Sequence, residues 1–136
     1  MATFNKFQDF IEKVGLAIHN LNTHTLKVYL SNEQPLAADT VKTDIADITA
    51  EHGYPAGGSD ITNLYTETSG TGTMTATDVV FTASGGSFGP FQFAVVYNDD
   101  ATNDNLVCWW DYGSAITIND TETFTVDFGA SVFTLA

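Results

Sequence analysis

Apolar and polar residues alternate through much of the C-terminal half of the chain. Residues 91–98 place aromatic or β-branched side chains at every second position, and residues 123–128 repeat the pattern with Phe124, Val126 and Phe128. Successive side chains of a strand point to opposite faces of a sheet. Each run therefore predicts a strand with one buried face and one polar face.

Shorter β segments flank these two runs. We expect further strands at residues 26–30, 71–77, 79–82 and 132–135. Glycine doublets and Asx residues mark turns, because glycine adopts positive φ angles and Asx side chains bond turn backbone. The expected turns are at residues 53–58, 98–105 and 119–120.

The N-terminal residues follow a helical period instead. The apolar positions recur at spacings of three and four and are Phe4, Phe7, Ile11, Val14, Ile18 and Leu21. This stripe predicts an amphipathic helix over residues 1–22, with Thr3 as its N-cap and its apolar face packed on the chain's own sheet rather than on a partner. Residues 39–49 predict a second, short helix with Val41, Ile45 and Ile48 inward.

These elements together predict a mainly β (α+β) fold. We expect an antiparallel β-sandwich or barrel-like sheet with the N-terminal helix packed on it. At 136 residues the chain is long enough for one domain with its own core. The expected organisation is a single domain, 1–136, with a helix over 1–22 and a β-rich body over 23–136.

The charge of the chain excludes some classes of partner. Seventeen acidic residues face four lysines and no arginine, which gives a formal net charge of −13. Nucleic-acid binding draws its affinity from basic residues that neutralise phosphates, and anionic membranes attract the same residues. We therefore expect neither nucleic acid nor a membrane as a partner.

Cysteine and the chain start give expectations about the compartment. Cys108 is the sole cysteine, so it forms no intrachain disulfide, and its apolar flanks predict a buried strand residue. The first residues interleave charges with apolar side chains and do not resemble a secretory signal. We expect synthesis and folding in a reducing cytoplasm.

Candidate chemical sites are weak. Asp99, Asp100 and Asp104 offer oxygen ligands for a cation, but their spacing does not match an EF-hand loop. The three histidines are spread over a helix end, a loop and a turn, without zinc-site spacing. We expect no catalytic residue, no metal site and no cofactor, and whether the 99–104 loop binds a cation stays open.

Residues 109–112 form an aromatic block in which Trp109 and Trp110 are adjacent. Adjacent strand residues face opposite ways, so the two indoles cannot share one core face. Either both faces of this strand are covered, or one ring is exposed as in protein interfaces and sugar-stacking surfaces. We leave both interpretations open. The candidate interface residues are Tyr54, Trp109, Trp110 and Tyr112.

Three segments resemble a family of small structural proteins of tailed double-stranded DNA bacteriophages. They are the N-terminal FNKFQDFIEKV, the GYPAGG turn with its following strand, and FTASGGSFGPFQFAVVYND…LVCWWDYGSAITINDTETFTVDF. The resemblance covers most of the chain and is strongest over residues 79–128. No catalytic motif comes with it, so no active-site residue is implied.

The resemblance implies a non-enzymatic virion protein made in the host cytoplasm, and specifically a decoration (cement) protein on the capsid exterior. Its partners would be the major capsid protein of the phage head and other copies of itself, in a homotrimer. It would stabilise the capsid lattice. One alternative is a tail, baseplate or fibre-associated virion protein. A second is a carbohydrate-binding β-sandwich module that stacks sugars on an exposed Trp or Tyr.

Overall fold

The computed structural model describes residues 2–136 and shows the mainly β, antiparallel fold that the sequence predicts. Its elements are β1 (Thr3–Lys6), α1 (Asp9–Gly15), β2 (Leu26–Ser31), the 3-10 turn η1 (Lys42–Asp44), β3 (Ser59–Asp60), β4 (Leu64–Thr68), β5 (Thr71–Thr75), β6 (Val79–Thr82), β7 (Phe88–Asn98), β8 (Leu106–Ile118), β9 (Thr123–Val126) and β10 (Phe133–Leu135).

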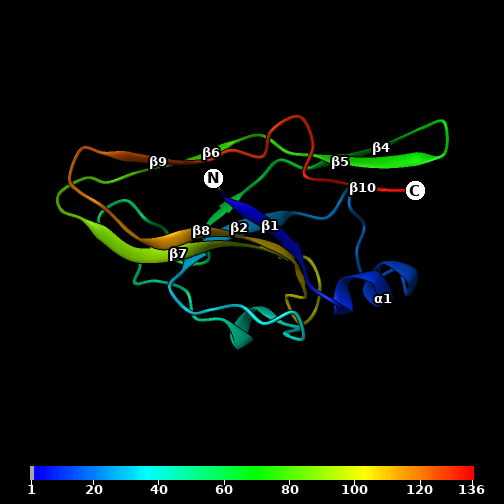
Figure 1. Ribbon diagram of the computed structural model, residues 1–136, viewed down its shortest axis with the longest axis horizontal. Coiled ribbons are helices and arrows are strands. Elements are labelled where there is room, and N and C mark those ends of the chain that lie inside the picture. Colours follow the sequence, from blue (N-terminus) through cyan, green and yellow to red (C-terminus); the bar gives the residue numbers. More distant parts are fainter. Residues whose placement is uncertain (1) are drawn as a thin grey trace.

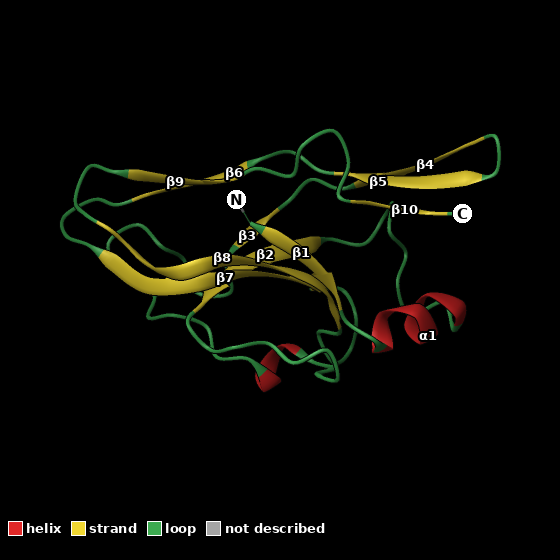
Figure 2. Cartoon of the chain, in the orientation of Figure 1, coloured by secondary structure: helices red, strands yellow, loops and turns green. Residues whose placement is uncertain are grey.

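The strands form three open sheets in a sandwich-like arrangement. The main sheet has the order β1-β8-β7-β2-β3, and two smaller sheets have the orders β10-β5-β4 and β6-β9. The β6-β9 sheet lies above the main sheet, and the β10-β5-β4 sheet continues this upper layer to the right, above α1 (Figures 1 and 2). An irregular segment that contains η1 lies below the main sheet. The main sheet is therefore the middle of three layers.

Each face of the main sheet has its own hydrophobic core. The upper core lies against the small sheets and contains, among others, Leu26, Val28, Leu30, Met74, Phe81, Ala94, Val96, Cys108 and Val126. The lower core lies against the irregular segment and contains Phe7, Tyr29, Ile45, Phe93, Val95, Tyr97, Leu106 and Trp109. Cys108 is fully buried in the upper core, as predicted.

The expectation of one polar face is wrong for β7. Residues 93–98 of this strand are all buried, on both faces of the sheet. The cause is the third layer, because it removes from water a face that the alternation pattern assigned to solvent. Strands covered on both faces are continuously apolar, and Ala94, Val95 and Val96 belong to such a run.

The alternation of faces in β7 also breaks at an irregular stretch of its pairing with β8. Phe91 pairs with Ile116 and Phe93 with Asp111, so four residues of β8, 112–115, lie opposite the single residue Gln92. Across this stretch β7 loses its strict alternation, and Phe91 joins the upper core while Phe93 joins the lower core. Strict period two would have placed both rings on one face.

The predicted helix over residues 1–22 is also wrong in extent. Residues Thr3–Lys6 form an edge strand paired with Trp109–Asp111 and Cys108 of β8, and only Asp9–Gly15 are helical. Sheet pairing overrides the weak helical preference of the first residues, since isolated short helices are marginal in water. The helix ends where Gly15 lowers helix propensity and Ala17 turns into a positive φ of 61°.

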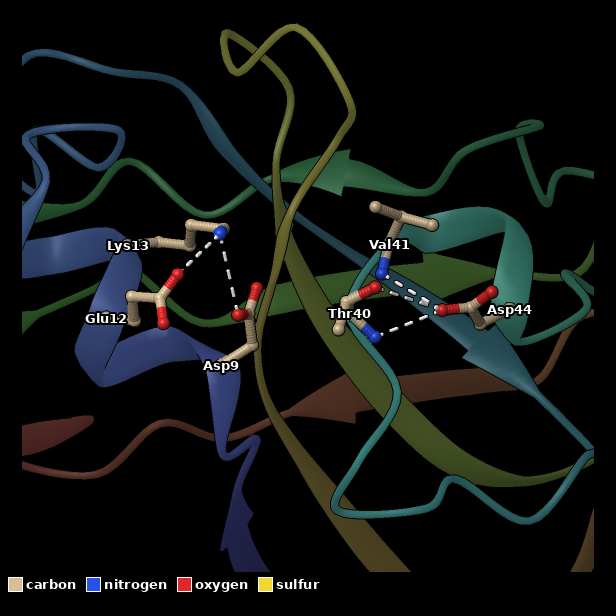
Figure 3. Close-up of polar contacts among 6 residues, drawn as sticks. All are labelled: Asp9, Glu12, Lys13, Thr40, Val41 and Asp44. Carbon is tan, nitrogen blue, oxygen red and sulfur yellow. Dashed lines mark hydrogen bonds and ion pairs between the residues drawn. The ribbon is translucent and has the colours of Figure 1, made fainter.

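The buried face of α1 differs from the predicted stripe. Phe10 is 1% exposed and packs 5.2 Å, between ring centroids, from Phe133 of β10, whereas Ile11 is 49% exposed. Phe10 and Val14, four residues apart, point into the upper core. Lys13 lies on the outer side, with its ammonium 3.6 Å from Asp9 and 3.2 Å from Glu12 (Figure 3).

Hydrogen bonds from buried tyrosines attach the irregular segment to the main sheet. The hydroxyl of Tyr29 donates to the carbonyl of Ile45 at 2.9 Å, and that of Tyr97 donates to the carbonyl of Gly57 at 2.9 Å.

The predicted helix over residues 39–49 is reduced to the single turn η1. The Asp44 carboxylate accepts the amides of Thr40 and Val41 and so holds a tight turn (Figure 3). These bonds hold the pKa of Asp44 below its usual range. Ile45 is nevertheless inward, at 1% exposed, whereas Val41 and Ile48 are half-buried.

We predict that the two neighbouring apolar residues of α1 differ sharply in their contribution to stability. Phe10→Ala should lower the free energy of unfolding by about 3–5 kcal/mol, because it removes a buried ring and leaves a cavity. Ile11→Ala should change it by less than about 1 kcal/mol, since that side chain is half exposed. Urea unfolding followed by tryptophan fluorescence measures both, and equal effects would contradict the observed helix phase.

Candidate interaction site

The structure divides the four candidate interface residues into two groups. Tyr54 and Trp109 are 2% and 6% exposed. Trp110 and Tyr112 are half-buried and line a cavity at the border of the sandwich. The two adjacent tryptophans therefore point to opposite faces, and both faces of β8 are covered at this point.

Tyr54 serves the sheet itself. Its hydroxyl donates to Asp47 Oδ1 at 2.6 Å and accepts the amide of Leu30 at 2.9 Å. β3 pairs only with Lys27 and Val28, so the amide of Leu30 lies beyond the end of that short strand. The tyrosine hydroxyl satisfies it, because an unpaired buried amide is costly. Trp109 likewise packs in the lower core, 4.5 Å from Phe7 between ring centroids.

The cavity beside Trp110 and Tyr112 has a volume of about 400 Å³. It lies where the main sheet and the β6-β9 sheet part, so its walls come from distant segments. The lining residues are Ala2, Trp110, Tyr112, Thr125, Asp127, Phe128 and Gly129. The size suits one large side chain or a small ligand.

The walls of this cavity are held in place by aromatic contacts. The Trp110 ring meets the rings of Phe4 and Phe128 edge to face, at centroid distances of 5.5 and 5.4 Å. Tyr112 meets Phe124 in the same way at 5.2 Å. Burial, with a further contribution from the Asp127 carboxylate, raises the pKa of Tyr112 to about 12, so its hydroxyl stays a neutral donor. The Asp127 side chain itself accepts the amide of Gly129 at 2.8 Å.

The strand next to this cavity is an edge of the main sheet. β1 pairs with β8 on one side, and no strand among residues 2–136 pairs with its other side. The amide of Phe7 donates to the carbonyl of Val107. Since hydrogen-bonded and non-bonded pairs alternate in an antiparallel ladder, the backbone groups of Phe4 and Lys6 point away from β8. The Phe4 ring is 40% exposed.

Most of the few positive charges are engaged within the molecule. Lys13 lies beside Asp9 and Glu12, and Lys27 lies 3.2 Å from Asp99. The ammonium of Lys42 sits 4.7 Å above the centroid of the Tyr29 ring. Lys6, on β1, makes no ion pair with residues 2–136. The field around the molecule is therefore strongly negative.

A polar cluster lies around Asn98, at the C-terminal end of β7. The side-chain amide nitrogen of Asn98 lies 3.0 Å from Nδ1 of both His19 and His24. An amide nitrogen only donates, so Nδ1 of each ring is the acceptor. Nε2 of His19 is buried without a partner among residues 2–136. Burial, followed by the neighbouring His24, lowers the pKa of His19 to about 4. No local sequence pattern signals this pairing, because 79 residues separate His19 from Asn98.

The acidic hairpin between β7 and β8 is used in backbone bonding. Asp100 accepts the amide of Thr25 at 2.6 Å, and Asp99 forms an ion pair with Lys27.

Within residues 2–136, no three His, Cys, Asp or Glu side chains are grouped so that they would hold a metal ion. No helix of this part is long and apolar enough to cross a membrane. Comparison of the chain with protein-family models, curated proteins and solved structures finds no match.

We predict that acid destabilises the fold through His19. The pKa of His19 is about 4 in the folded protein and about 6.5 when unfolded. Below about pH 6.5 the unfolded chain binds the proton more readily than the folded protein. The contribution of neutral His19 to the free energy of unfolding is therefore fully present above this pH and is lost as the pH falls toward 4. The loss from this group should reach up to about 3 kcal/mol.

His19→Gln tests this prediction in urea unfolding between about pH 7 and pH 4. The variant should lose less stability on acidification than the unmodified protein, whatever its stability at neutral pH. The exposed His52→Gln is the matched control and should keep the original pH profile. Parallel profiles for all three proteins would show that His19 does not couple folding to pH.

Proposed function

We propose that this chain is a non-enzymatic structural protein of a tailed-phage virion, and specifically a decoration protein on the outside of the head. The observation that carries the proposal is the distribution of charge. With a net charge of −13 and three of its four lysines in internal contacts, the molecule presents an acidic surface. Such a surface is repelled by packaged DNA and is suited to the capsid exterior.

The fold supports the same function. A middle sheet covered on both faces, with two separate cores, gives a compact body from a short chain. Rigid, well-packed surfaces bind with less loss of conformational entropy than mobile ones. Many copies of such a body, each bound across neighbouring capsid subunits, would raise the free energy needed to rupture the lattice. Self-association as a homotrimer is part of this proposal.

We predict that the chain is abundant in the head fraction of its phage. Particles would be separated into heads and tails, and the chain counted against the major capsid protein by quantitative peptide mass spectrometry. A decoration protein should be present in a constant ratio to the major capsid protein and should bind saturably to expanded, undecorated capsids. A few copies confined to tails would contradict the proposal and favour a tail or baseplate component. Absence from both fractions would reject a virion role.

A carbohydrate-binding module is the second candidate. The observation that favours it is the half-buried pair Trp110 and Tyr112 beside a cavity of about 400 Å³. A change in tryptophan fluorescence on addition of a polysaccharide, lost in Trp110→Ala, would support this function. The same change in a Trp109→Phe control would be expected to persist.

A further inference from the structure

We propose that the border of the sandwich at β1 is a peptide-binding cleft. In this cleft an extended segment of a partner protein would pair with β1 as an added strand. It would place one apolar side chain in the cavity beside Trp110, with a lysine or arginine opposite Asp127. The proposal concerns any protein partner and does not depend on whether the chain resides in heads or tails.

The first argument is the unpaired edge of β1. The backbone groups of Phe4 and Lys6 point away from β8, and the side chains of both residues are exposed. Such an edge is a template for another extended chain, because each outward amide and carbonyl can bond a partner backbone. β1 begins directly after Ala2, which lines the cavity, so the free edge and the cavity are contiguous.

The second argument is the shape and chemistry of the cavity. It opens where two sheets part, next to the C-terminal end of β9, and aromatic rings wall it. In Figure 2, β1 begins below β6 and runs to the lower right. In strand addition, backbone bonds supply affinity and pockets for alternate side chains supply specificity. An apolar residue of the added strand that points toward the small sheets would enter beside Trp110 and Phe128.

The third argument is charge, which selects among occupants. Asp127 is exposed at the rim, and the whole chain carries −13. A second copy would bring a like-charged surface with few lysines to offer, so charge complementarity favours a basic segment from a different protein. A sugar would need an open ring face, whereas the Trp110 ring already meets Phe4 and Phe128.

A random peptide library, displayed and selected against the full chain, tests the proposal although the partner is unidentified. Enriched peptides should combine an aromatic or branched apolar residue with lysine or arginine. Their binding should fall about tenfold or more in Asp127→Lys, because the change reverses the rim charge. Asp60→Lys is the matched control and should bind as the unmodified protein does. Asp60 is also exposed, also accepts the amide two residues on, and lies in β3 at the opposite edge of the same sheet.

A second pair of variants tests strand addition itself. Lys6→Pro removes one outward amide but leaves the bonds of Asn5 to β8, and proline is tolerated on edge strands. Peptide binding should weaken about fivefold or more in Lys6→Pro and stay unchanged in Lys6→Ala. Far-UV circular dichroism and urea unfolding establish that each variant is folded.

Two results would overturn the proposal. One is no enrichment of peptides, or enriched peptides that bind equally to Asp127→Lys and Lys6→Pro. The other is saturable binding of a polysaccharide that Trp110→Ala abolishes, which would assign the cavity to sugars.

Discussion

β7 carries large apolar side chains on both of its faces, and the rest of the structure depends on covering them. One face packs under the two small sheets and the other over the irregular segment that contains η1. Removing either layer would expose buried rings to water, at a cost in free energy of roughly 25 cal/mol for each Å² of apolar area. The long loops of this chain are therefore part of the core and are held by tyrosine hydroxyls.

This constraint also explains where the molecule is left open. The lower layer is a single continuous segment, whereas the upper layer is built from two separate sheets that do not share hydrogen bonds. At the border of β1 the upper and main sheets part, and the rings of Trp110 and Tyr112 line the resulting cavity. The candidate site follows from how the layers meet rather than from a local motif.

The acidic surface and the open edge have complementary consequences. Like-charged copies repel one another at this edge, which opposes the aggregation that a free strand edge invites. The same charge attracts a basic partner to that edge. A proposed role on the capsid exterior and a proposed peptide-binding cleft thus draw on one physical property, and the cleft rests in addition on the free edge of β1 and the cavity beside Trp110.

The β class, most strand positions, the Asx-rich hairpin and the burial of Cys108 could all be predicted from the sequence, because side-chain periodicity and turn chemistry are local. The strand at residues 3–6 could not be predicted from the sequence, because its hydrogen bonds come from β8, about 100 residues further along the chain. Phe91 and Phe93 face opposite cores across an irregular stretch of the pairing between β7 and β8, which no local pattern encodes. Tyr54 and Trp109 became interior residues and Trp110 and Tyr112 cavity walls through contacts of the same long-range kind. Periodicity identifies a face of an element, but the segment that covers this face comes from distant parts of the chain.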